Sequence, residues 1–336
     1  MARVAGLLGR AMGRELYAGL DLGGTKIAAA LLTGDGRVVG RARLNSRAGS
    51  RAEVVADTMI GAVDEALRGA GVTRAALRGA GIGAPGLLDF ETGVIAFAPN
   101  LGMRDFPLRD YITDRLGVPV FLDNDVNMGT YGEYLAGAAR GSRYVLGVFP
   151  GTGVGGGLVV NGQVFRGANG TAGEVGHIIV QQGGALCGCG QRGCLEAYAS
   201  RSAIARDLVM LAAIGQAPTV RAAAGTRLKA VKSGVIARAV AAKEPAVRAV
   251  VERSARFLGI GVANCVNLFS PDLVVLGGGL VEKLGGRYVA QVERAMHEHA
   301  LQASAAGVRV VAAELGDAAA IHGAAGGLRE MLAEGA

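Results

Sequence analysis

Short apolar runs separated by glycine-containing turns are the clearest pattern in the chain. Three such runs follow one another near the start, and the same plan returns from residue 144. Each set predicts three strands joined by tight turns, and a plan that occurs twice predicts an internal duplication. The predicted strands are 17–20, 27–32 and 38–44 in the first set, and 144–149, 155–160 and 163–165 in the second.

Apolar positions at helical spacing follow the first set. Ile60, Val63 and Leu67 recur at this spacing after Ser50 and Glu53, whose separation is that of a capping box, so a helix is predicted to about Arg68. Beyond it strands and helices alternate, which predicts an α/β fold. The further predicted strands are 79–84, 118–122, 272–276 and 308–313, and the further predicted helices are 126–138, 246–268, 288–300 and 318–332.

Length and composition agree with two hydrophobic cores. The chain has 336 residues, more than the usual length of one domain, and 51% of them are apolar. No apolar run approaches the roughly 18 residues that a membrane span requires. Residues 1–15 carry scattered arginines and no small-residue cleavage site, so we interpret them as an N-terminal extension. We expect a cytoplasmic protein with no membrane partner.

The charge balance raises the question of nucleic-acid binding. The 35 basic and 28 acidic residues give a net charge of +7. However, the sequence has no compact Lys/Arg run, no Trp and no helix-turn-helix pattern before the first strand. The arginines between residues 37 and 51 are better explained as a solvated strand edge. We therefore predict no nucleic-acid partner.

Two glycine-rich stretches, 81–86 and 151–156, match the dinucleotide-binding string G-x-G-x-x-G. A dinucleotide site needs a helix directly after the glycines. Pro85 and the strand-like pattern of 157–160 argue against such a helix at either place. A Walker-type loop is disfavoured further, because the sequence contains no Gly-Lys dipeptide.

The hairpin turns 21–26 and 151–153 offer a different phosphate site. Glycine tolerates positive φ and lets an anion approach backbone N–H groups, so two such turns facing one cleft can hold a polyphosphate. Either turn alone is better explained as a sharp turn. In the first turn, Asp21 is a candidate for holding Mg²⁺ through water, and Lys26 is a candidate for offsetting phosphate charge.

Three of the four cysteines lie within eight residues: Cys187, Cys189 and Cys194 form a C-x-C-x4-C motif, and His177 precedes them. In a reducing compartment this set favours Zn²⁺ over a disulfide; the alternative is unligated cysteines. Three thiolates and one imidazole fill a tetrahedron and leave no position for a reacting water. We therefore expect a structural Zn²⁺ that shapes a loop. Cys265 lies alone on an apolar helix face and is expected in the core.

Small polar residues follow the predicted strand 118–122, where open α/β sheets bind ligands. In the run Asp123-Asn124-Asp125-Val126-Asn127, one explanation is helix capping by Asn124 or Asp125. The other is a carboxylate acting as general base on a hydroxyl, with amides arranging that hydroxyl. Glu174 and Glu196 lie on either side of the cysteine motif. If Zn²⁺ orders that loop, both can accept hydrogen bonds from a polyol.

Taken together, these motifs resemble the ROK family of sugar kinases and sugar-responsive repressors, within the actin-like ATPase superfamily. The resemblance covers roughly residues 16–332. It departs from the family at Phe149-Pro150, where Thr or Ser with Leu is frequent, and at Asp123, where Glu is commoner. The motifs that carry the resemblance are 21–26, 98–101, 124–127, 151–157, 174–177, the cysteine motif through Glu196, and 271–279.

The resemblance implies an α/β, actin-like (RNase H-like) duplicated two-domain fold with an interdomain cleft. We place a small N-terminal domain at 16–123 plus about 316–336, and a large domain with the zinc loop and the oligomer interface at 124–315. Asp125 resembles the base that takes a proton from the sugar 6-hydroxyl. The implied sugar ligands are Asn100, Asn124, Asp125, Glu174, His177 and Glu196, and His177 also binds Zn²⁺. The implied contacts to ATP and Mg²⁺ are Asp21, Gly23, Gly24, Thr25, Lys26, Gly151, Thr152 and Gly153, with Gly277, Gly278 and Gly279 near the adenosine.

The predicted function is that of an ATP-dependent hexokinase, with D-glucose as the expected substrate and a homodimer or homotetramer as the expected assembly. Alternatives within the class are kinases for N-acetylmannosamine, fructose or allose, and a glucokinase that uses polyphosphate. A sugar-sensing repressor is disfavoured, because about 15 residues before the first strand are too few for a winged helix and because Asp125 is present.

Overall fold

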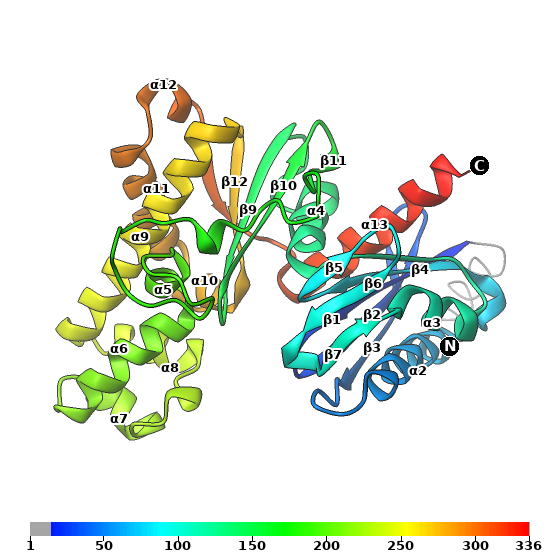
Figure 1. Ribbon diagram of the computed structural model, residues 1–336, viewed down its shortest axis with the longest axis horizontal. Helices are drawn as coiled ribbons and strands as arrows, with labels where there is room; N and C mark the ends of the chain where they lie inside the picture. Colours follow the sequence, from blue (N-terminus) through cyan, green and yellow to red (C-terminus); the bar gives the residue numbers. More distant parts are fainter. Residues whose placement is uncertain (1–14, 336) are drawn as a thin grey trace, which may run out of the picture. The chain divides into compact units, whose positions relative to one another are not determined.

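The computed structural model describes residues 15–335, so residues 1–14 of the predicted extension lie outside the described part (Figure 1). The described residues form two compact units. Unit 1 consists of residues 15–140, 166–171 and 317–335, and unit 2 of residues 141–165 and 172–316. The division falls after Arg140, whereas the sequence placed it after Asp123.

The position of this division follows from helix packing. Helix α4 (Asp125–Ala136) packs along α13 (Ala319–Glu334), and glycines let the two backbones touch. A Cβ at Gly132 would overlap the Ala319 carbonyl, and one at Gly323 would overlap the Met128 carbonyl. The close crossing keeps α4, and with it Asp125, in unit 1.

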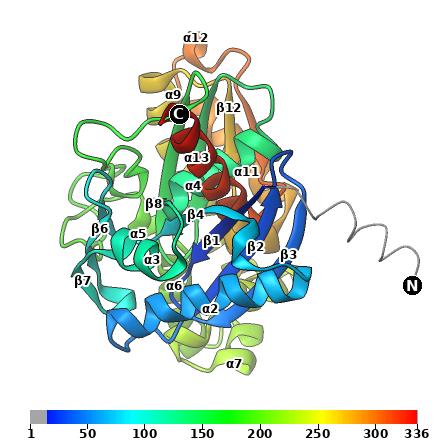
Figure 2. The ribbon, with the colours of Figure 1, turned by 90° about the vertical axis from the view of Figure 1, so that its right-hand side faces the viewer.

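The main sheet of unit 1 has the strand order β3-β2-β1-β4-β8. The first three strands are antiparallel, and β4 and β8 continue the sheet in parallel. Helix α2 (Ala52–Ala70) covers one face and α13 covers the other (Figure 2). The strands are β1 (Leu16–Leu22), β2 (Lys26–Thr33), β3 (Val38–Asn45), β4 (Leu77–Ala84) and β8 (Val120–Asn124).

A second, three-stranded sheet in unit 1 was not predicted. Strands β5 (Leu87–Asp89), β6 (Val94–Ala98) and β7 (Met103–Phe106) form an antiparallel meander, followed by α3 (Leu108–Leu116). Ile95 and Met103 bury this sheet in the core of unit 1, whereas Leu87 and Phe97 remain exposed.

Unit 2 repeats the strand plan of unit 1. Its sheet has the order β11-β10-β9-β12-β13, with β9, β10 and β11 antiparallel and β12 and β13 added in parallel. The predicted duplication is thereby confirmed at the level of topology. The strands are β9 (Tyr144–Pro150), β10 (Val154–Val160), β11 (Gln163–Val164), β12 (Leu273–Leu276) and β13 (Arg309–Ala312).

Helices pack on this second sheet and form the larger hydrophobic core. Helix α9 is the longest and packs against α11, where Gly259 lets it approach Ala295. Among the described helices, none alone has the length and apolar composition of a membrane span; α6 and α7 meet those criteria only jointly, with a 102° bend between them. The helices are α5 (Glu196–Ala199), α6 (Arg201–Ala213), α7 (Pro218–Ala224), α8 (Ser233–Ala241), α9 (Pro245–Phe269), α10 (Gly278–Leu284), α11 (Gly286–His299) and α12 (Gln302–Ala305).

Candidate functional site

Asp125 is the first residue of α4, directly after the end of β8. Asn124 is the helix N-cap: its side-chain oxygen accepts hydrogen bonds from Val126 N (2.9 Å) and Asn127 N (3.2 Å). The capping explanation therefore applies to Asn124. Asp125 is half-buried, and its carboxylate accepts a hydrogen bond from Val126 N at 2.9 Å. Burial raises the pKa of Asp125 to about 6, although this hydrogen bond opposes the rise.

Asp21 lies near Asp125, although about a hundred residues separate them in sequence. It is the second-last residue of β1 and is paired with Gly83 of β4. Burial raises the pKa of Asp21 to about 7; the negative charges of Asp125 and Asp317 add to the rise, and Arg43 opposes it. Hard divalent cations prefer carboxylate oxygens, so this group of acids suits Mg²⁺.

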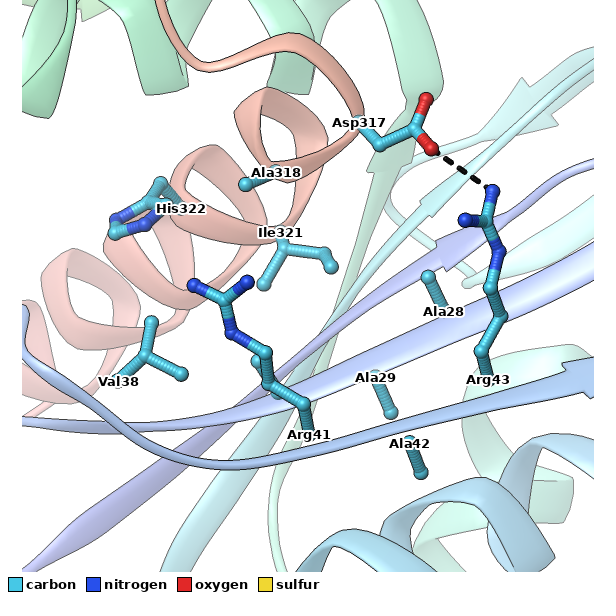
Figure 3. A pocket seen from close by; sticks show the side chains of 11 residues that line it. Ala28, Ala29, Val38, Arg41, Ala42, Arg43, Asp317, Ala318, Ile321 and His322 are labelled. Atoms are coloured by element: carbon cyan, nitrogen blue, oxygen red, sulfur yellow. Dashed lines mark hydrogen bonds and ion pairs between the residues drawn. The ribbon is translucent and has the colours of Figure 1, made fainter.

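Asp317 and Arg43 influence the pKa of Asp21, and neither was predicted from the sequence as part of the site. They form a 2.8 Å ion pair at the rim of a pocket of about 320 Å³ within unit 1 (Figure 3). The pocket lies between β2, β3 and the start of α13, and its floor is hollow because the side chains there are alanines. Neither residue belongs to a recognisable motif. Only the fold brings this pair into the surroundings of Asp21.

The two predicted phosphate turns are hairpin turns, as expected, but their glycines have a different role. In none of Gly23, Gly24, Gly151 and Gly153 is φ in the left-handed region, so positive φ does not explain them. A Cβ at Gly24 or Gly151 would meet no atom within 4 Å. The backbone is thus open to a ligand at these two positions. Thr25 and Lys26 at the first turn and Thr152 at the second are exposed.

In unit 2 the structure brings together the four predicted metal ligands. Their ligand atoms all lie within 4.8 Å of one another. Cys189 Sγ and Cys194 Sγ are 3.7 Å apart, and Cys187 Sγ is 3.9 Å from His177 Nδ1. A tetrahedral site with Zn–S bonds of about 2.3 Å separates its sulfurs by roughly 3.8 Å. The residues present therefore fit a Cys₃His zinc site.

Two carboxylates adjoin this cysteine cluster. Glu196 begins α5 and accepts hydrogen bonds from Val154 N (3.0 Å) and the Cys187 thiol (3.6 Å). It also fills the space beside Gly153, where a Cβ would overlap Glu196 Oε2. Glu174 Oε2 is 3.9 Å from His177 Nε2, the ring nitrogen that faces away from the cysteines. The second predicted phosphate turn (151–153) and the predicted sugar ligands of unit 2 (Glu174, His177 and Glu196) thus form one contiguous group.

The remaining predicted residues lie apart from these groups. Asn100 is exposed in a short 3₁₀ turn between β6 and β7, at the edge of the small sheet. Gly277 follows β12, and a Cβ there would overlap the Phe149 ring. Gly278 requires glycine because its φ is +82°. The structure thus gives a packing reason for Gly277 and a backbone-conformation reason for Gly278, and a role near adenosine remains a proposal.

A protein-family model, curated proteins and solved structures all match most of this chain. The ROK family model matches residues 17–330. The chain is 36% identical to the glucokinase of Halalkalibacterium halodurans over 93% of this chain and 94% of that protein. It is 31% identical to a putative xylose repressor of a Caldicellulosiruptor species over 92% of this chain and 76% of that protein. Its fold superposes with a TM-score of 0.80 on the ROK family glucokinase of Streptomyces griseus solved with glucose and AMPPNP, at 32% identity over 93% of this chain and 98% of that one.

Proposed function

Because the chain belongs to the ROK family, we propose that it is a sugar kinase that transfers the γ-phosphoryl group of ATP to the 6-hydroxyl of a hexose, with D-glucose as its substrate. The observation that carries the proposal is the position of Asp125, half-buried at the junction of β8 and α4 with a pKa of about 6. A carboxylate with a pKa near the working pH is suited to accept a proton from an attacking hydroxyl. The glucokinases among the relatives support the choice of substrate.

In this mechanism the chain mainly positions and neutralises, since phosphoryl transfer demands little covalent work from the protein. Asp125 takes the hydroxyl proton as the oxygen forms its bond to the γ-phosphorus, and ADP leaves. Glu174, Glu196 and His177 Nε2 hold the other sugar hydroxyls, with contributions from Asn124 and Asn100. The Asn124 side-chain oxygen already caps α4, so its amide nitrogen is the group free to donate to the sugar.

The turns at 23–26 and 151–153 bind the ATP phosphates through backbone N–H groups, and Lys26 offsets their charge. Asp21 would hold Mg²⁺, which supplies further neutralisation when bound. His177, Cys187, Cys189 and Cys194 would hold a structural Zn²⁺ that keeps His177 and Glu196 in place. Gly277 to Gly279, at the start of α10, would lie near the adenosine.

One assay tests the proposal. The purified protein is mixed with Mg²⁺ and ATP, and ADP release is followed with glucose, N-acetylmannosamine, fructose and allose, and in parallel with polyphosphate as donor. We expect the highest kcat/KM with glucose and ATP. A preference for another hexose or for polyphosphate would change the substrate and keep the kinase. Glucose binding without ADP release would contradict a kinase and favour a sugar-responsive regulator; one relative is named a putative xylose repressor.

A further inference from the structure

We propose that the ion pair between Arg166 and Asp123 positions the general base: it fixes the loop that presents Asp125, and Arg166 is a positioning residue for catalysis. This inference rests on the proposed kinase function. In the sequence, Asp123 is only one member of a polar motif, and no pattern points to Arg166.

The carboxylate of Asp123 is completely buried, with 0% of its side chain exposed, and two of its partners, Asn124 and Asn127, flank Asp125 in the sequence. One oxygen, Oδ2, accepts from Arg166 Nε at 2.8 Å and from Arg166 Nη2 at 2.7 Å. The other, Oδ1, accepts from Asn124 N at 2.6 Å and from Asn127 Nδ2 at 3.1 Å. Asp123 therefore ties down the residue before the base and the residue two positions after it.

Arg166 supplies the positive charge that compensates this buried carboxylate. A buried charge that loses its partner is strongly destabilising, because its desolvation is no longer compensated. Without Arg166, the buried carboxylate of Asp123 loses its ion-pair partner, which favours its movement toward water. Such a movement disturbs the hydrogen bonds that Oδ1 accepts from the Asn124 backbone and the Asn127 side chain, on either side of Asp125.

The position of Arg166 in the chain is a second reason to expect an effect on the site. It is the first residue of the segment 166–171, which belongs to unit 1 although the chain before and after it belongs to unit 2. Within this segment Gly170 packs on Phe90, where a Cβ would overlap the ring. The chain then reaches Glu174, a proposed sugar ligand, three residues after the segment ends. Arg166 thus anchors the start of the stretch that leads to the sugar-binding residues.

Arg166 bonds to Asp123, two residues before Asp125, so its loss should act on the chemical step through misplacement of the base. A misplacement of about 1 Å at a reacting group can cost on the order of 100-fold in rate. We expect Arg166→Gln to lower kcat at least about tenfold while the glucose Kd changes less than about threefold. Arg166→Lys keeps the charge but offers a single ammonium in place of two N–H donors, and should fall between Gln and the wild type.

The double variant Arg166→Gln/Asp123→Asn separates positioning from general damage. It removes the uncompensated charge and leaves two amides that can hydrogen-bond, so part of the kcat lost in Arg166→Gln should return. Arg74→Gln is the matched control. It removes another two-donor ion pair of unit 1, that of Arg74 with Asp64 at 2.7 Å, which has no contact with the 123–127 loop. Its kcat should stay within about twofold of the wild type.

The experiment measures kcat, KM and glucose Kd for these five proteins, together with amide hydrogen exchange of the peptide that spans 123–128. Faster exchange of this peptide in Arg166→Gln, but not in Arg74→Gln, is expected. Unchanged kcat and unchanged exchange in Arg166→Gln would overturn the inference, as would equal losses in Arg74→Gln. A wild-type protein inactive on every hexose would refute the proposed function, and the exchange data would still decide whether Arg166 orders the loop.

Discussion

Two carboxylates of unit 1, Asp125 and Asp21, have raised pKa values. Burial is the first cause for both, and Asp21 in addition feels Asp125 and Asp317. Perturbed pKa values of this kind cluster at sites where a protein needs a proton acceptor or a cation site. The sequence indicated both residues from their motifs, but it did not contain the information that they are close together.

The proposed role of Asp125 as general base predicts how turnover depends on pH. A general base must be deprotonated, so kcat should fall as the pH decreases through about 6, the pKa to which burial raises this group. Mg²⁺ at Asp21 should hold that neighbour ionised over the same range. Measurement of kcat between pH 5 and 9 with saturating Mg²⁺-ATP and glucose checks this expectation. A rate that is independent of pH from 5 to 8 would exclude Asp125 as the titrating base.

The cysteine loop between η3 (Val175–His177) and α5 carries the zinc site proposed for this chain, next to two of the proposed sugar ligands. Burial raises the pKa of the Cys187 thiol, so an ion must displace its proton to bind. We predict that Cys189→Ser loses zinc and weakens glucose binding about tenfold, because His177 and Glu196 lose their support. Zinc analysis and calorimetric glucose titration measure both effects.

Cys265 provides the control for this prediction. It lies in the core of unit 2 on α9, outside the ligand cluster. Cys265→Ala should lower the free energy of unfolding by about 1 kcal/mol. The zinc content and the glucose affinity of this variant should equal those of the wild type. A zinc-free Cys189→Ser protein with wild-type glucose affinity would show that the metal does not support the sugar site.

The second phosphate turn offers a matched pair of glycine substitutions. A Cβ at Gly153 would overlap Glu196 Oε2, whereas a Cβ at Gly151 would meet nothing within 4 Å. We therefore predict that Gly153→Ala displaces Glu196 and weakens glucose binding about tenfold, measured without nucleotide, and that Gly151→Ala does so by less than about twofold. Equal glucose affinities in the two variants would show that Glu196 is not a sugar ligand.

Periodicity predicted the regular elements well where they are long and buried. Helix α9 was predicted at 246–268 and occupies Pro245–Phe269, and β9 was predicted at 144–149 and occupies Tyr144–Pro150. The capping box at Ser50 was wrong: α2 has Arg51 as its N-cap, and no side chain caps it. Strands β5 to β7 were missed because they have three to five residues and expose Leu87 and Phe97, so alternation is too short to recognise.

The duplication was visible in the sequence because hairpin turns recur, but the assignment of α4 to a unit was not. Glycines on α4 and α13, two helices distant in sequence, decide that assignment through a close backbone crossing. The candidate site likewise depends on contacts between segments that are distant in sequence. Motifs predicted Asp125 and the cysteine cluster, whereas Arg166, Arg43 and Asp317 act through contacts between segments that no local pattern connects.

In the proposed mechanism the two units have different tasks: the proton acceptor, Asp125, is in unit 1, and the proposed sugar-binding carboxylates Glu174 and Glu196 are in unit 2. Asp125→Asn should therefore lower the rate of turnover, whereas Glu196→Gln should weaken sugar binding. Loss of general-base assistance costs about 10²–10⁴-fold in rate. Loss of one charged hydrogen-bond acceptor costs about 1.5–3 kcal/mol of binding.

The most direct measurement is a side-by-side determination of kcat and glucose Kd for the wild type and these two variants. We predict that Asp125→Asn loses about 10²–10⁴-fold in kcat with a glucose Kd within about threefold of the wild type. Glu196→Gln should weaken glucose binding at least about tenfold. Turnover that survives in Asp125→Asn, or glucose binding that disappears together with it, would contradict the central claim.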